Sequence, residues 1–184
     1  MKATGIVRRI DDLGRVVIPK EIRRTMRIRE GDPLEIFTDR EGEVIFKKYS
    51  PIGELQNFAT EYCETLQKTS GMPIFICDRD AVIAVSGASK REYMDKKISK
   101  ELEDIMENRT LYHRDYKSED KFITDFGREH FISCAMPIIS EGDVIGCVLS
   151  ASSAGSVGDD KISKEVETKL IQTAAIFLGK QMEN

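Results

Sequence analysis

The first fifty residues alternate between short strand-like runs and turn-forming residues, and this pattern limits the fold more than any other feature of the sequence. It predicts four short strands, at residues 4–9, 15–18, 34–38 and 44–48. Asp and Gly favour a chain reversal within each strand pair, at residues 11–14 and 39–42. A unit of about fifty residues is too small to bury a sufficient core alone. We therefore expect it to complete its core with a second copy of the chain.

A short helix is predicted between the two strand pairs. Pro19 suits its first turn, where a missing backbone N–H costs nothing. Ile22 and Met26 are four residues apart and are expected to form the buried stripe of this helix. The first unit is therefore rich in β-structure, with one helix between its hairpins.

Ser50 and Pro51 mark the start of a second helix and the boundary between two predicted domains, residues 1–50 and residues 51–184. Apolar residues then follow at alternating spacings of three and four, which we call the heptad seam: Ile52, Leu55, Ala59, Tyr62 and Leu66. The narrow seam favours packing in a helical bundle between copies of the chain. Packing of the same residues on the sheet of their own domain is the alternative.

Beyond residue 73 the pattern predicts an α+β sandwich. The expected elements are two strand pairs, a polar helix between them and a closing helix, at residues 74–77, 81–85, 90–107, 131–139, 144–151 and 160–182. The closing helix carries a long apolar face: Ile162, Val166, Leu170, Ala174, Phe177 and Leu178.

The net charge of −4 conceals an uneven distribution. Residues 2–29 hold nine Lys or Arg and three Asp or Glu, whereas residues 51–184 hold 16 Lys or Arg and 23 Asp or Glu. A basic head on an acidic body indicates that one end meets a polyanion. A merely solvated charged face is the alternative.

The basic residues of the head occupy positions that suit contact with a duplex. Arg8 and Arg15 flank the first turn. The basic residues of the short helix form two rows on its surface, each made of two residues four positions apart: Lys20 with Arg24, and Arg23 with Arg27. The planar guanidinium group bonds bidentately to phosphates and to guanine edges, so these residues predict DNA binding.

The order of residues in the head resembles the AbrB-type swapped-hairpin DNA-binding domain. The likeness covers residues 4–24, including Asp11-Asp12-Leu13-Gly14-Arg15-Val16-Val17-Ile18-Pro19, and continues through residues 31–36 and 47–49. The whole chain is similar to a family of sporulation transcription regulators in which this head precedes a GAF-like domain. That resemblance implies a homodimer of interleaved hairpins that controls sporulation genes.

The resemblance also implies which residues touch double-stranded DNA: Arg8, Arg15, Arg23 and Arg24, with Lys2 and Arg9 at flanking positions. Glycine is common among relatives at the position of Arg27. In the alternative, some arginines pair with Asp11, Asp12 or Glu21 and hold the dimer together. The head has no recognition helix of helix-turn-helix length, so we expect it to read groove width and deformability at A·T-rich sites.

The resemblance further implies that helices flanking the second domain pack between dimers and produce a tetramer, which assigns the heptad seam to oligomerisation. GAF domains often bind small molecules, so binding of a small-molecule ligand of unknown identity to the second domain is left open. The loop from Ser86 to Lys90 is either an anion site at a helix N-terminus or a strand-to-helix turn capped by serine.

No metal site or cofactor is predicted. The two histidines, His113 and His130, lack ligand-like spacing to the four cysteines, Cys63, Cys77, Cys134 and Cys147. The cysteines lie among apolar neighbours and are expected to be reduced core residues.

Two other functions are weighed against the transcription regulator. An antitoxin with a swapped-hairpin head normally has a short flexible tail, whereas about 130 folded residues follow this head. A GAF-type methionine sulfoxide reductase requires an exposed thiol in an electropositive setting, and the predicted settings are apolar, so no enzyme is expected. No apolar run reaches the ~20 residues of a membrane helix and no secretory signal is recognised, so a cytoplasmic protein is expected.

Overall fold

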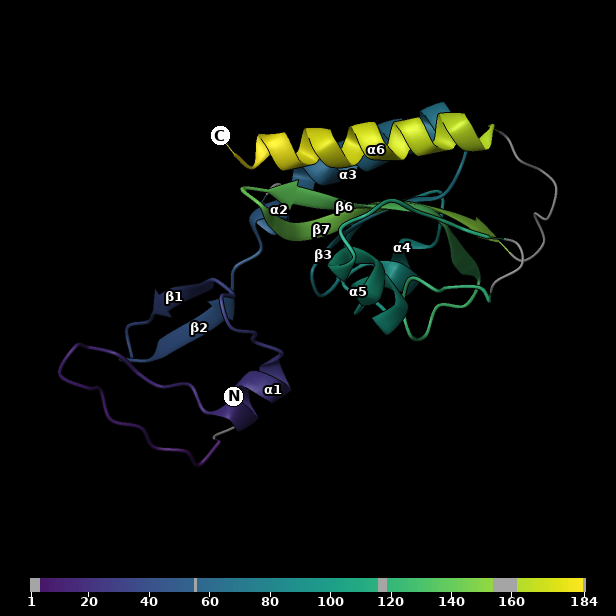
Figure 1. Cartoon of the computed structure of the whole chain (residues 1–184). Coiled ribbons are helices and arrows are strands. Elements are labelled where there is room, and N and C mark those ends of the chain that lie inside the picture. Colours follow the sequence, from purple (N-terminus) through teal and green to yellow (C-terminus); the bar gives the residue numbers. More distant parts are fainter. Residues whose placement is uncertain (1–3, 55, 116–118, 154–161, 184) are drawn as a thin grey trace. The chain divides into compact units, whose positions relative to one another are not determined.

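Figure 1 shows the computed structural model of the chain, which describes residues 4–54, 56–115, 119–153 and 162–183. The chain divides into two compact units, Met1–Tyr49 and Ser50–Asn184, which we call the head and the C-terminal unit. Among the described helices, none is long and apolar enough to cross a membrane.

The head contains helix α1 (Lys20–Met26) and an antiparallel pair of strands, β1 (Leu34–Thr38) and β2 (Val44–Lys48). The bounds of both strands confirm the second predicted strand pair. Asp39 closes the turn between them, because its Oδ1 accepts hydrogen bonds from the backbone N–H groups of Glu41 and Glu43 at 2.9 and 2.8 Å.

Residues 4–18 form no strand in the described part of the chain, so the strands predicted at residues 4–9 and 15–18 are wrong for a single copy. The segment reverses direction as predicted, because the N–H of Asp11 donates to the carbonyl of Arg15 and the N–H of Gly14 donates to the carbonyl of Asp11. A strand requires a neighbour that pairs with its backbone groups. Within the described residues of one copy, no strand lies in register with this segment.

The head buries few of its apolar side chains within one copy. Among the large apolar residues of 4–18, Val7 is 86% exposed and three others are 69% exposed each: Ile10, Leu13 and Val17. Helix α1 contains no buried residue, and Met26 is 44% exposed. The predicted buried stripe of Ile22 and Met26 is therefore wrong for a single copy, because a unit of this size has too little neighbouring structure to cover it.

The C-terminal unit is built on an antiparallel sheet with the strand order β4-β3-β7-β6-β5. Its strands are β3 (Ile74–Asp78), β4 (Val82–Ser86), β5 (Tyr112–His113), β6 (His130–Ser140) and β7 (Asp143–Ser153). The sequence predicts β3, β4, β6 and β7 at nearly these bounds. It does not predict β5, because two residues are too short to show a period.

Helices cover both faces of this sheet (Figure 1). Helices α3 (Gln56–Ser70) and α6 (Lys164–Gln181) lie on one face, and α4 (Lys90–Tyr93) and α5 (Lys100–Glu107) lie on the other. Helix α2 (Pro51–Glu54) precedes α3. Successive side chains of β3 enter two separate cores: Ile74 and Ile76 pack towards α3 and α6, and Phe75 and Cys77 pack in the other core. This arrangement confirms the predicted α+β sandwich.

The single polar helix predicted at residues 90–107 is wrong, because the chain leaves the helix after Tyr93. Asp95 has a positive φ of 59°, and Ile98 forms an isolated bridge with Thr124. A new helix starts at Lys100 because Oγ of Ser99 accepts a hydrogen bond from the N–H of Leu102 at 3.1 Å. Ser99 is recognisable in the sequence as an N-cap residue, but the polar residues on both sides of it favour one uninterrupted helix.

Helix α6 begins at Lys164, a few residues later than the predicted start at residue 160. Oγ of its N-cap residue Ser163 accepts a hydrogen bond from the N–H of Val166 at 3.4 Å. Residues 160 and 161 lie outside the described residues. The C-terminal end of the helix agrees with the prediction to within one residue.

Candidate nucleic-acid interface

One carboxylate organises the turn at residues 11–14. Oδ1 of Asp11 accepts hydrogen bonds from the backbone N–H groups of Leu13 at 3.1 Å and Arg15 at 2.8 Å. Oδ2 of Asp11 accepts a third from Nε of Arg15 at 2.8 Å. The hydrogen bonds from the backbone and then the side chain of Arg15 lower the pKa of Asp11, so this carboxylate stays ionised at neutral pH.

The other predicted DNA-contacting residues differ in exposure. Arg8 and Arg9 are exposed on the extended segment before the turn, and Arg24 is exposed on α1. Arg23 is half-buried, and its buried Nε has no hydrogen-bond partner among the described residues. Lys2 lies outside the described residues.

The two basic rows predicted for α1 are only partly formed. Lys20 and Arg24 both lie within the helix, but Arg27 follows it with a φ of 53° in the left-handed region. The row from Arg23 to Arg27 is therefore wrong. The carbonyl of Arg27 accepts a hydrogen bond from Nζ of Lys48 at 3.2 Å. Glycine adopts this backbone conformation without strain, which accounts for the glycine expected at this position in relatives.

The arrangement presents guanidinium groups on two parts of the head, the segment around the turn and α1. Exposed guanidinium groups bind phosphate oxygens and base edges through several N–H donors at once. The sequence indicates Asp11 as a partner for arginines, but it does not show that this residue both closes the turn and holds Arg15. The available signal was an Asp-x-x-Gly turn followed directly by an arginine.

The heptad seam does not form a continuous exposed surface. Ile52 and Ala59 have no exposed area and Leu66 is 7% exposed, and all three belong to the core under α3 and α6. These three residues are therefore unavailable to a second dimer, and their assignment to oligomerisation is corrected to packing in their own domain. Tyr62 is half-buried at the edge of this core, and Leu55 lies outside the described residues.

Helices α3 and α6 share an aromatic cluster that the sequence does not predict. The ring centroid of Tyr62 lies 6.0 Å from that of Phe58 and 5.4 Å from that of Phe177. Phe177 remains 39% exposed and Val166, on the same helix, 47% exposed. The sequence does show apolar residues beside the buried stripe of α6. It does not show that they contact α3, because the apolar spacing within each helix says nothing about which other helix it meets.

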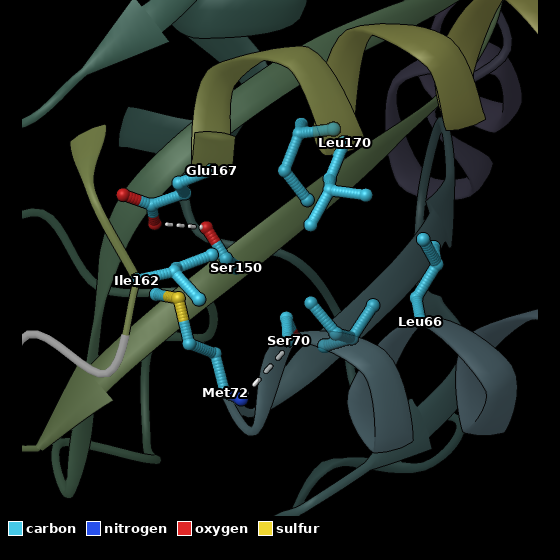
Figure 2. Close-up of a pocket in the computed structure, with 9 residues that line it drawn as sticks. Leu66, Ser70, Met72, Ser150, Ile162, Glu167 and Leu170 are labelled. Atoms are coloured by element: carbon cyan, nitrogen blue, oxygen red, sulfur yellow. Dashed lines mark hydrogen bonds between the residues drawn. The ribbon is translucent and has the colours of Figure 1, made fainter. Parts of the chain in front are cut away.

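A small cavity lies between α3, α6 and the sheet (Figure 2). Its volume of about 10 Å³ corresponds to about one water molecule. Glu167 is buried beside it and accepts a hydrogen bond from Oγ of Ser150 at 2.6 Å. The second carboxylate oxygen of Glu167 lies 3.2 Å from Nε2 of His113. These contacts tie α6 to strands β7 and β5 and satisfy the buried carboxylate.

The loop from Ser86 to Lys90 leads from β4 into α4, which is only four residues long. Nζ of Lys90 lies 3.5 Å from a carboxylate oxygen of Glu64, so this ammonium group already has an anionic partner. Ser89 is the N-cap residue of α4 but its side chain makes no capping hydrogen bond. The loop therefore has the character of a strand-to-helix turn.

All four cysteines are free and have no exposed area. Burial raises the pKa of Cys63 and of Cys134 to about 12 each. Burial likewise raises the pKa of Cys77 and Cys147 well above the usual value. Among the described residues, no group of three or more His, Cys, Asp or Glu could hold a metal ion.

Two family models match the chain. Residues 54–183 match the model described as stage V sporulation protein T C-terminal, transcription factor. Residues 7–53 match the model described as antidote-toxin recognition MazE, bacterial antitoxin. The chain is also 53% identical over 183 residues to stage V sporulation protein T of Bacillus subtilis (strain 168), which covers 100% of this chain and 99% of that relative.

Two further matches concern one unit each. Over 51 residues the chain is 63% identical to the transition state regulatory protein AbrB of Bacillus subtilis (strain 168), covering 28% of this chain and 52% of that relative. A type II free methionine-R-sulfoxide reductase from Thermoplasma acidophilum matches 70% of this chain and 94% of its own, with a TM-score of 0.50 and 16% identity. At that identity the likeness concerns the fold alone.

The fold and these matches define a transcription factor with an AbrB-like head and a C-terminal α+β sandwich. The chain belongs to the stage V sporulation protein T family. This membership confirms the predicted fold class and the predicted role as a regulator of sporulation.

We expect the thiols to react slowly with a disulfide reagent such as 5,5′-dithiobis(2-nitrobenzoate) in native protein at pH 8, because the thiolate is the reactive form and the raised pKa values keep all four groups protonated. Absorbance of the released thiolate measures the reaction, and the same protein in denaturant provides the control. A thiol that reacts in the native protein as fast as in denaturant contradicts this prediction.

Proposed function

We propose that the chain acts as a homodimer in the bacterial cytoplasm and binds double-stranded DNA through Arg8, Arg15, Arg23 and Arg24, with Arg9 and Lys2 as flanking contacts. The observation that carries the proposal is the exposure of guanidinium groups on both the turn segment and α1 of a strongly basic head. The identity of 63% with AbrB over 51 residues supports the same function for this unit.

The dimer is argued from the exposed apolar side chains of the head. Val7, Ile10 and Val17 lie on a segment that forms no strand within one copy, although its sequence favours strands. Pairing with a second head satisfies the backbone of this segment and removes these side chains from water, at about 25 cal/mol for each Å² of apolar area. Dimerisation also doubles the number of arginines that reach one duplex.

The binding mode is electrostatic and responds to DNA shape. A contact between arginine and phosphate positions the protein without reading sequence, so selectivity arises in the groove, where width and deformability favour A·T-rich sites. The MazE model covers only residues 7–53, and the C-terminal unit matches a transcription-factor model instead of extending as a toxin-binding tail. We therefore favour gene regulation over an antitoxin function.

Two dimers associate through the aromatic cluster of α3 and α6. Phe177 remains partly exposed in contact with Tyr62, so the cluster presents an apolar surface that spans the two helices. Burial of such a surface between copies stabilises a tetramer, as the heptad seam was predicted to do. Ligand sensing by the C-terminal unit stays a prediction. The cavity beside Glu167 does not support it, because this cavity has room for only about one water molecule.

DNA affinity is expected to fall steeply with salt. If a dimer neutralises about eight phosphates, the slope of log K against log salt is about −7, and Arg24→Ala, which removes one phosphate contact from each copy, reduces it to about −5. Fluorescence anisotropy with an A·T-rich duplex measures both slopes. Arg40→Ala is the control, because Arg40 is exposed in the β1–β2 turn and lies outside the proposed contact set. A wild-type slope shallower than about −2 contradicts the proposed function.

The substitution Phe177→Glu is expected to convert the tetramer into dimers, since it places a carboxylate in the aromatic cluster formed with Phe58 and Tyr62. Ile176→Glu is the matched control, because Ile176, the preceding residue of α6, is 55% exposed and points about 100° away around the helix. Multi-angle light scattering measures the mass of each protein. A wild-type dimer, or a Phe177→Glu tetramer that melts like the wild type, rules out this interface.

A further inference from the structure

The two adjacent acids of the first turn differ in what they contact, although both place a negative charge near the proposed DNA surface. Asp11 accepts three hydrogen bonds, two from backbone N–H groups and one from Nε of Arg15. Asp12 is exposed, and no contact of its side chain is found among the described residues. The pair therefore separates the effect of a carboxylate that holds an arginine from the effect of charge alone.

The contact with Nε restricts Arg15 without occupying the rest of its guanidinium group. An arginine side chain has five N–H donors, and Nε contributes one of them. The four N–H groups on Nη1 and Nη2 remain available for an incoming acceptor. The side chain of Arg15 is 69% exposed although Asp11 holds it at Nε, so the contact leaves most of the side chain open to solvent.

The same carboxylate also fixes the backbone from which Arg15 projects. Its Oδ1 binds the N–H of Arg15 itself at 2.8 Å, and the backbone N–H of Asp11 donates to the carbonyl of Arg15 at 3.1 Å. Gly14 provides the positive φ of 75° that the turn requires. The direction of the Arg15 side chain is consequently set at both its base and its guanidinium group.

We propose that Asp11 is a positioning residue that orients Arg15 for a directional contact in the DNA groove and thereby increases discrimination between DNA sequences. This inference rests on the proposed DNA-binding role of Arg15. A held guanidinium loses less conformational freedom when it meets a groove acceptor of matching geometry. A carboxylate next to the duplex also repels phosphates, but this repulsion acts on any DNA and leaves the ratio of affinities unchanged.

The lowered pKa of Asp11 agrees with this role. Hydrogen bonds from Arg15 favour the charged form, so the carboxylate is ionised above its lowered pKa and loses its hold on Nε only when acid protonates it. The orienting contact is therefore fully present at neutral pH.

The test compares full-length wild-type protein with Asp11→Asn, Asp12→Asn, Arg15→Ala and the double variant Asp11→Asn/Arg15→Ala. Asparagine retains an oxygen that accepts the backbone hydrogen bonds of the turn, but its amide NH₂ cannot accept from Nε. Both Asn variants remove one negative charge. The probes are a duplex that the wild-type protein selects from a random library and a scrambled duplex of the same length, and the readout is the ratio of their affinities.

We expect Asp12→Asn to strengthen binding to both duplexes equally and to leave the affinity ratio unchanged. Asp11→Asn is expected to lower the ratio by up to about fivefold for each copy in the dimer. In the Arg15→Ala background, Asp11→Asn is expected to have no further effect on the ratio, because the residue through which it acts is gone.

Two outcomes overturn the inference alone. In the first, Asp11→Asn and Asp12→Asn change the ratio equally, so that only charge matters. In the second, Asp11→Asn lowers the ratio as much in the Arg15→Ala background as in the wild type, so that Asp11 acts only through the fold of the turn. Loss of salt dependence in the wild type, or unchanged binding by Arg15→Ala, instead contradicts the proposed function itself.

Discussion

The head has more apolar surface than one copy of it covers, and the rest of the account depends on this constraint. Its segment before α1 combines a strand-favouring sequence with side chains such as Val7 that are almost fully exposed. Removal of apolar area from water is the main favourable contribution to folding, so a unit of about fifty residues gains stability by associating with another copy. The proposed dimer follows from this imbalance before any resemblance is considered.

The same constraint connects folding to DNA binding. The turn that carries Arg15 lies within the segment that lacks a strand partner in one copy. The positions of the basic side chains on this segment therefore depend on how it pairs with a second copy. Asp11 fixes the turn locally, through hydrogen bonds that need no second copy. The head therefore combines a locally determined turn with a proposed dimeric framework that sets the spacing of its arginines.

The C-terminal unit is different, because it fills two cores within one copy. Alternate residues of β3 enter the two cores, and the buried carboxylate of Glu167 has partners on two strands. Among its large apolar side chains that remain exposed are Phe177 in the aromatic cluster and Phe126. One unit thus folds from its own residues and offers a limited surface for association, whereas the other is proposed to fold through association.

The sequence predicts local structure well where one period or one turn determines it. Strands β1 and β2 agree with their predicted bounds, because alternating residues flank an Asp-to-Gly turn. Prediction fails where distant residues decide the outcome: the bridge between Ile98 and Thr124 interrupts a polar stretch that favours a helix. The buried face of α3 was likewise assigned to another dimer, since a heptad spacing does not distinguish the core of its own domain from a partner helix.

Part of the candidate interface was also predictable. Its arginines are evident from the charge distribution, and Arg24 is exposed as DNA contact requires. The hold of Asp11 on Nε of Arg15 depends on side-chain geometry that the sequence does not specify. The left-handed backbone at Arg27 was equally hidden, because arginine gives no sign of the positive φ that glycine normally signals.

The most direct test of the central claim is an isotope-filtered nuclear Overhauser experiment on full-length protein. Carbon-13-labelled and unlabelled chains are mixed, unfolded and refolded together, so that half of the dimers contain one copy of each. The account predicts contacts between the methyl groups of Val7 and Val17 in the labelled copy and protons of the unlabelled copy. If those methyl groups show contacts only within their own chain, the head folds without a second copy and the account is wrong.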